Sequence, residues 1–456
     1  MEFSTLLFIY AFLPISVIVY YLAPKRFRNA VLLIISLSFT AMAGLYFLAF
    51  MAAFTVINYF MGIIIGKTGK IKAISLFFTF LGTAADALVF LIFRSELFST
   101  FSAAAKITEL VIPIGLTFLT LSAIGYLIDV YRDNCKAEYS FFRFSLYTVM
   151  FTKLPAGPLV SCSEFSEMVK KRSEGINAVG EGLEKFTIGL AKKILLADNL
   201  YRLYSATAAI EVTKMSALSA WLGAAAYMLC LYFTLSGISD MGQGLSLCFG
   251  FRFPDSFNYP GISFGVNDFG KKWHIPVVKW FDTYFFESIR SRISNRFIKY
   301  SVPVIMWIMI ALWYEVSLNK LICGFIIGLS VAIEKKASEK NSVGKSSVIY
   351  TFFILSLSTI FFFGDSISYS FYYFLALIGG NNNIADSLSL YLLRNYIILI
   401  MAGFIFASGV RKLFLQHKAV KTAENLISPF VILFLLVVCT AVISYSGSAG
   451  SILIEL

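Results

Sequence analysis

The chain has 456 residues, of which 58% are hydrophobic and 14% are charged, and its formal net charge is +12. Soluble domains carry about 25% charged residues, so a soluble fold is excluded because it could not bury this much apolar surface. The positive charge does not indicate nucleic-acid binding, because the basic residues lie in short loops between apolar segments and not along one face.

The apolar segments, taken in chain order, predict an all-α transmembrane bundle that crosses the bilayer about 10 to 12 times. A helix needs about 20 apolar residues to cross a hydrocarbon core of about 30 Å. The clearest candidates are Phe3–Ala23, Leu45–Ile65, Ser346–Gly364 and Leu426–Tyr445. The first has no basic region before it and no small-residue cleavage site, so we expect a retained span and not a cleaved signal peptide.

The basic loops predict the orientation of these spans. Positive residues concentrate in cytoplasmic loops, and the loops near Lys25, Lys67, Lys335 and Arg411 fall on one side if each span crosses once. We therefore place these loops in the cytoplasm and the N-terminus outside.

Residues 1–456 are predicted to form one membrane-embedded domain, with N-terminal spans over 1–94, a core over 111–333 and C-terminal spans over 346–456. Prolines 113, 155 and 158 break the apolar runs between residues 111 and 199. Broken backbone at membrane depth persists only when protein surrounds it, so we expect re-entrant or short helices there. A polar and aromatic insertion from Asp240 to Lys299 predicts further short helices within the bundle.

Ionisable residues in such a chain are candidates for function. Asp86 lies inside an apolar run and either faces a polar partner within the bundle or marks a water-filled path. His274 is one of two histidines and is a candidate proton acceptor or a structural hydrogen-bonding residue, whereas His417 lies in a basic loop that we expect to be solvated. The six cysteines form no CxxC pair, so we expect small buried residues and neither a metal site nor a disulfide framework.

Several segments carry a family resemblance. They are IPIGLTFLTLSAIGYLIDVYR from Ile112, FTKLPAGPLVSCSEF from Phe151, GLAKKILLAD from Gly189, the stretch from Ser236 to Trp280, and FFFGDSISYSFYYFLALIGG from Phe361. In this order they resemble the membrane-bound O-acyltransferase family, and specifically its bacterial branch of alginate O-acetyltransferases and teichoic acid D-alanylation proteins. The resemblance implies an all-α fold of that family.

One position departs from the family pattern. Members of the branch carry a membrane-embedded histidine to which catalysis is assigned, and Tyr314 occupies that position in the stretch ALWYEVSLNKLICGFIIG, followed by Glu315. A tyrosine with an ordinary pKa of about 10 is a poor proton acceptor at neutral pH. A buried Glu315 could replace it, but it lies about 100° further around a helix. His274 matches the pattern.

The resemblance implies two functions of different classes, with a pure transporter as a weaker third. In the first, the chain transfers an acetyl group to an extracellular polymer; in the second, it is an inactive scaffold. We expect catalytic roles for His274, Tyr314 and Glu315, and substrate-binding roles for Asp240, Asn258, Lys271, Lys272 and Trp273. The implied donor is a thioester of coenzyme A or of an acyl carrier protein, with no tightly bound cofactor. The implied partners are the lipid bilayer, a secreted or membrane-anchored acyltransferase and a polysaccharide synthase.

Overall fold

The computed structural model describes residues 2–94, 115–155, 157–287, 296–339, 348–410 and 418–446. Within these ranges the regular structure is helical throughout, which confirms the predicted all-α class. The helices that are long and apolar enough to cross a membrane are Leu45–Thr68, Lys72–Arg94, Ala217–Cys248, Ser387–Ser408 and Ile427–Tyr445. Shorter apolar helices accompany them. The chain is therefore a multi-pass membrane protein. Arg411 and His417 lie outside the described residues.

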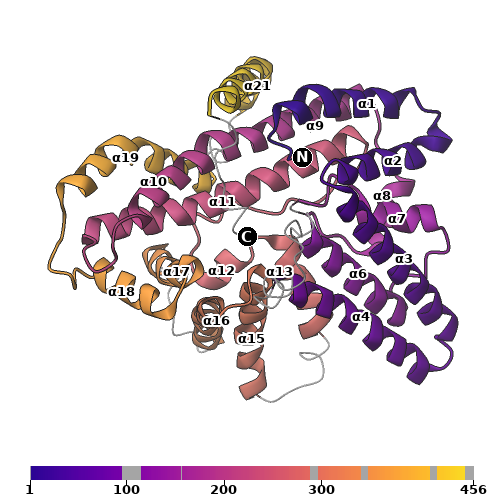
Figure 1. Cartoon of the computed structure of the whole chain (residues 1–456), viewed down its shortest axis with the longest axis horizontal. Coiled ribbons are helices and arrows are strands. Elements are labelled where there is room, and N and C mark those ends of the chain that lie inside the picture. The colour runs from indigo at the N-terminus through magenta and orange to yellow at the C-terminus, as the bar shows by residue number, and fades with distance from the viewer. Residues whose placement is uncertain are drawn as a thin grey trace. The chain divides into compact units, whose positions relative to one another are not determined.

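The chain forms two compact units. Unit 1 comprises Met1–Ile188 and Ile238–Asp255, and unit 2 comprises Gly189–Gly237 and Ser256–Leu456. The helices of unit 1 are α1 (Leu13–Leu22), α2 (Arg28–Ala41), α3 (Leu45–Thr68), α4 (Lys72–Arg94), α6 (Leu116–Tyr131), α7 (Phe141–Val149), α8 (Cys162–Lys170) and most of α9 (Ile176–Ala191). They are labelled in Figure 1.

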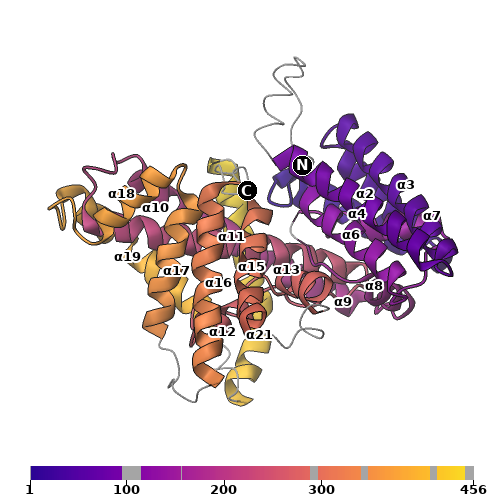
Figure 2. The ribbon, with the colours of Figure 1, turned by 90° about the horizontal axis from the view of Figure 1, so that it is seen from below.

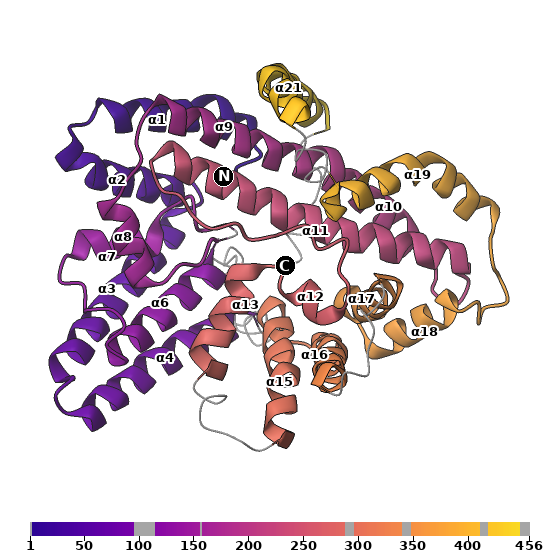
Figure 3. The same ribbon diagram turned by 180° about the vertical axis from the view of Figure 1, so that it is seen from behind.

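Helices α3, α4 and α6 of unit 1 lie side by side (Figure 3). Phe60, Phe80 and other large apolar side chains on α3 and α4 are exposed, as expected where lipid and not water surrounds a helix. Asp86 is buried on α4 and accepts a hydrogen bond of 3.0 Å from the side-chain amide of Asn58 on α3. Of the two alternatives for Asp86, the structure therefore supports the polar partner within the bundle.

Helix α11 (Ala217–Cys248) corrects the expected start of the polar insertion. Asp240 lies within this helix, which continues to Cys248. Its last turns approach α9 closely, because a Cβ atom on Gly244 would lie 2.5 Å from the carbonyl oxygen of Gly182. The buried amide of Gln243 donates to the carbonyl of Pro254 at 2.9 Å. Small residues and the hydrogen bond donated by Gln243 thus keep this sequence helical, where its polarity alone suggested a break.

Unit 2 contains α10 (Asp198–Ala208), most of α11, α12 (Val266–Gly270), α13 (Ile275–Phe281), α15 (Arg296–Tyr314), α16 (Leu318–Glu339), α17 (Val348–Phe363), α18 (Ile367–Leu377), α19 (Ser387–Ser408) and α21 (Lys418–Ser446). Helices α15, α16 and α17 lie side by side (Figure 2). The short helices α12 and α13 confirm that the remainder of the polar insertion is broken into short elements.

Two glycines bring α16 against α15. A Cβ atom on Gly324 would lie 2.5 Å from the carbonyl oxygen of Trp307, and one on Gly328 would lie 2.6 Å from Cα of Val304. Small residues four apart on one helix allow this approach between apolar helices. The contact holds the middle of α15, about two turns before Tyr314.

Candidate active site

His274 is held in an unusual backbone conformation. It precedes α13 with φ 40° and ψ 51°, in the left-handed region. A non-glycine residue there costs on the order of 1–3 kcal/mol and persists only where its surroundings fix it. Two backbone hydrogen bonds flank it: Ile275 N–H donates to the carbonyl of Ser256 at 2.8 Å, and Asn258 N–H donates to the carbonyl of Lys272 at 3.0 Å. The loop from Ser256 therefore determines where the imidazole points.

The imidazole of His274 contacts the hydroxyl of Tyr314 at the end of α15. Nδ1 and the hydroxyl oxygen are 2.9 Å apart, and both side chains are buried. Phe257 stacks on the imidazole with 5.3 Å between ring centroids, and Trp313 lies 5.8 Å away. The structure thus brings His274 against Trp313 and Tyr314 in the interior of unit 2.

Burial decides the protonation state of His274. The residue lies outside the candidate membrane spans, and desolvation by the surrounding side chains lowers the pKa of its imidazole to about 3. It is therefore uncharged at neutral pH. If Nδ1 carries the proton and donates to Tyr314, Nε2 keeps a lone pair that can accept a proton; if Tyr314 donates, Nε2 carries the hydrogen.

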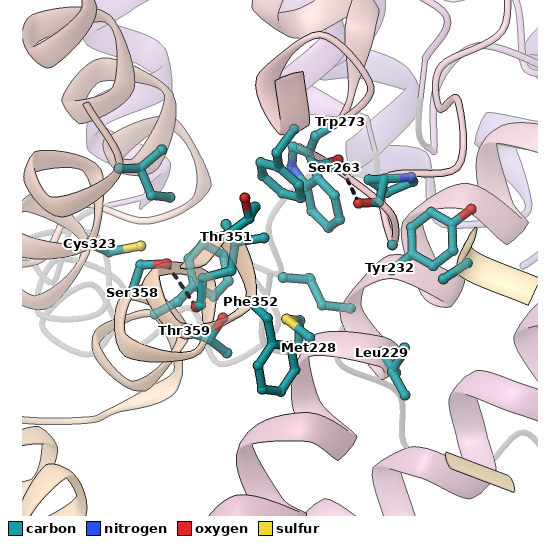
Figure 4. A pocket seen from close by; sticks show the side chains of 18 of the residues that line it. Met228, Leu229, Tyr232, Ser263, Trp273, Cys323, Thr351, Phe352, Ser358 and Thr359 are labelled. Atoms are coloured by element: carbon teal, nitrogen blue, oxygen red, sulfur yellow. Dashed lines mark hydrogen bonds between the residues drawn. The ribbon is translucent and has the colours of Figure 1, made fainter. Parts of the chain in front are cut away.

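An apolar cavity of about 120 Å³ adjoins Tyr314, the partner of His274. Trp273 and Tyr314 form part of its wall, and Trp273 stacks on Phe269 with 5.2 Å between centroids. Figure 4 shows Phe352 of α17 near Met228 of α11 at the same cavity. A space lined mainly by apolar side chains suits a hydrocarbon chain or a short acyl group better than a charged one.

Glu315 is placed differently from Tyr314. Its carboxylate pairs with the ammonium group of Lys320 at 2.8 Å, and its side chain is 49% exposed, against 7% for that of Lys320. The ammonium group also donates to the carbonyl of Phe362. Tyr314, and not Glu315, is therefore the residue whose side chain contacts His274.

The remaining candidates occupy varied settings. Lys272 is bound by Asp268 at 2.8 Å and by the carbonyl of Ile262 at 2.8 Å. Lys271 and Asn258 are exposed. These residues belong to unit 2 together with Trp273, whereas Asp240 belongs to unit 1. The described part of the chain shows no group of three or more His, Cys, Asp or Glu side chains placed to bind a metal ion.

The sequence analysis did not predict the roles of two residues near the site. Lys320 is buried, and Asn319 beside it donates from its side-chain amide to the carbonyl of Gly364. Together they fasten the start of α16 to the end of α17. The available signal was a lysine inside an otherwise apolar run, LNKLICGFIIG, where an unpaired charge would be costly.

Comparisons with known proteins identify sequences to which this chain is similar. The model of the MBOAT, membrane-bound O-acyltransferase, family matches residues 132–341. The chain is 33% identical over 345 residues to the probable alginate O-acetylase AlgI of Pseudomonas aeruginosa, covering 74% of this chain and 66% of that protein. It is 31% identical over 371 residues to the protein of the same name in Pseudomonas syringae pv. tomato, covering 79% and 70%. It is 25% identical over 459 residues to the peptidoglycan O-acetyltransferase of Helicobacter pylori, covering 90% and 87%.

Proposed function

The chain belongs to the membrane-bound O-acyltransferase family, and on that premise we propose that it transfers an acetyl group from a cytoplasmic thioester donor to a hydroxyl of an extracellular polysaccharide or cell-envelope polymer. The observation that carries the proposal is the buried contact between His274 and Tyr314 beside an apolar cavity. The names of the relatives, which refer to alginate and to peptidoglycan, support an envelope polymer as the acceptor.

In this proposal His274 is the proton acceptor. The acceptor hydroxyl oxygen attacks the thioester carbonyl carbon and its proton passes to Nε2 of His274. The carbon–sulfur bond then breaks, and the departing thiolate takes that proton from Nε2 and leaves as the donor thiol. Tyr314 holds the Nδ1–H tautomer through its hydroxyl oxygen. A base of low pKa is weak on its own, so negative charge that develops beside the imidazole must stabilise its protonated form.

We place the acyl group of the donor in the apolar cavity. Its apolar lining would exclude water from the acyl group next to Trp273 and Tyr314. The donor is a thioester of coenzyme A or of an acyl carrier protein. The acetyl group reaches polymer made by a polysaccharide synthase either directly or through a secreted or membrane-anchored acyltransferase, and the N-terminus of the chain lies outside the bacterial inner membrane.

A second function is favoured by one specific observation. Tyr314 stands where the sequence pattern of the family has its histidine, and Glu315, the next residue in the chain, is paired with Lys320. Neither Tyr314 nor the ion-paired Glu315 is a strong proton acceptor. The chain would then be a catalytically inactive scaffold that holds the other components of a polymer-acylation complex.

Deletion of the gene and complementation with variants tests both functions. Labelled acetyl is followed from cells into extracellular polymer. His274→Ala is compared with His417→Ala, and Tyr314→Phe is compared with Tyr300→Phe, since Tyr300 lies on the same helix but bonds the exposed Glu339. Loss of labelling with His274→Ala alone among the histidine variants supports the enzyme. Labelling that requires the gene but not His274 supports the scaffold, and labelling that persists without the gene rules out both.

A further inference from the structure

Two cysteines that are far apart in sequence meet in unit 1. Cys135 follows α6 and Cys162 is the first residue of α8, 27 positions later. Their sulfur atoms are 2.7 Å apart, and both are free thiols. A disulfide joins two sulfur atoms about 2.0 Å apart, so a small side-chain movement brings this pair to bonding distance. Sequence spacing does not predict this contact, because the two residues belong to no CxxC motif.

The thiol pair opens into a second cavity, separate from the one beside Tyr314 and inside unit 1. This cavity has a volume of about 650 Å³ and is lined by Cys135, Cys162 and charged side chains that include Lys136, Arg143 and Glu138. So many charged groups would be costly in contact with lipid. The cavity is therefore aqueous, and small water-soluble reagents can reach its walls.

The two thiols differ in solvent exposure and in the groups that surround them. Cys135 is partly exposed whereas Cys162 is buried. The neighbouring Cys162 thiol lowers the pKa of Cys135, against the opposing effects of burial and of the carboxylates of Asp129 and Glu138. Thiolates and not thiols are the nucleophiles, so Cys135 is the thiol that reacts first. Nearby carboxylates repel anionic reagents and leave a small neutral oxidant unaffected.

We infer that Cys135 and Cys162 form a redox-active dithiol, a modification site that takes a small hydroperoxide as its oxidant. The Cys135 thiolate attacks one peroxide oxygen, the O–O bond breaks, and the departing oxygen takes up a proton, so that Cys135 becomes a sulfenic acid. The Cys162 sulfur then attacks the Cys135 sulfur and water leaves. In sum, two thiols and one hydroperoxide give one disulfide, one alcohol or water from the peroxide, and one water.

The surrounding structure favours this bond. The start of α8 is fixed by a capping box, in which Glu164 N–H donates to the side chain of Ser161 and Ser161 N–H donates to the side chain of Glu164. Cys162 is therefore held in place while Cys135 lies in the turn after α6. The disulfide would tie this turn to α8 across one wall of the aqueous cavity.

The test uses the full chain, purified in lipid nanodiscs and first reduced. Excess hydrogen peroxide is added, remaining thiols are counted with a maleimide reagent, and peptides are mapped by mass spectrometry. We expect four of the six thiols to remain, a cross-linked peptide pair containing Cys135 and Cys162, and recovery of all six after reduction. Cys230→Ser, which removes another buried cysteine, should leave the cross-link unchanged.

The variants decide the order of reaction. Cys162→Ser should leave Cys135 as a sulfenic acid that a dimedone probe traps, whereas Cys135→Ser should leave Cys162 unlabelled by the same probe. Phenylarsine oxide, which binds two neighbouring thiols, should protect both cysteines from maleimide in the wild-type chain. Failure of the reduced wild-type protein to form the cross-link under peroxide, or cross-links made equally by the other cysteines, would overturn the inference without requiring any variant to fold.

Discussion

The hydroxyl oxygen of Tyr314 lies 2.9 Å from Nδ1 of His274, although 40 positions separate the two residues. Tyr314, which we expect to occupy the histidine position of the family pattern, is therefore in direct contact with His274. A substitution at either residue acts on the same hydrogen bond.

Tyr314→His should raise or create acyl transfer. A well-placed base contributes on the order of 10²- to 10⁴-fold, and the new imidazole would stand beside His274 and the apolar cavity. We expect only part of that factor, because the Glu315–Lys320 pair differs from the family pattern and supporting residues orient a catalytic group. Labelled acetyl incorporated into polymer is the measurement, with His274→Ala expected to abolish it. A folded Tyr314→His protein with no gain would contradict the role given to this position.

Acidification should destabilise the protein through His274. Burial lowers the pKa of the imidazole to about 3 in the folded chain, from an ordinary value near 6.5. Between these values the unfolded state binds one more proton, so stability is lost as the pH falls below about 6.5. At about pH 5 the loss is on the order of 2 kcal/mol. Thermal unfolding in detergent, compared between about pH 5 and neutral pH, measures this loss of stability. His274→Gln should reduce the pH dependence, and an unchanged slope would exclude His274 as its source.

Gly324→Ala should separate α15 from α16. The new methyl carbon would lie 2.5 Å from a backbone carbonyl on α15, which cannot move aside as a side chain can. We expect destabilisation of about 1–3 kcal/mol and reduced transfer. Gly180→Ala on α9 is the matched control, because nothing lies within 4 Å of its added carbon, and it should be neutral or stabilise by roughly 0.5–1 kcal/mol. Equal effects of the two substitutions on the melting temperature would refute the close contact.

Lys320→Met should cost more stability than Glu315→Gln. The methionine removes the donor to the Phe362 carbonyl and leaves that buried acceptor unpaired, at a cost of about 1–3 kcal/mol. The glutamine keeps an oxygen that accepts from Lys320 at a half-exposed position, so its cost should stay below about 1 kcal/mol. Denaturation of both variants in the same detergent compares them. The reverse order would show that the ion pair and not the carbonyl contact fastens α16.

The loops near Lys25, Lys67, Lys335 and Arg411 should all be cytoplasmic. The physical reason is the preference of basic residues for the cytoplasmic side of short loops. Single cysteines introduced at these loops into a cysteine-free background should be protected from an impermeant thiol reagent in intact cells and labelled in inverted vesicles. A cysteine near Lys25 and a cysteine near Lys67 that label from opposite sides would contradict the topology.

The sequence by itself determined the class of this protein. Long apolar runs and basic loops leave a helical membrane bundle as the only way to satisfy the backbone, and motif order identified the family. It also singled out Tyr314 and Glu315. It could not say which of the two contacts His274, because adjacent residues on a helix point in different directions and a single turn at the end of α15 decides the matter.

Only the tertiary structure decided the chemistry of individual side chains. Asn58 and Asp86, Lys320 and the Phe362 carbonyl, and Cys135 and Cys162 are each separated by 27 to 42 positions and are joined only by helix packing. Local pattern carries no information about such pairs, since a buried polar group is selected by what lies opposite it and not by its neighbours in sequence. The same holds for His274, whose charge state follows from burial created by residues on other elements.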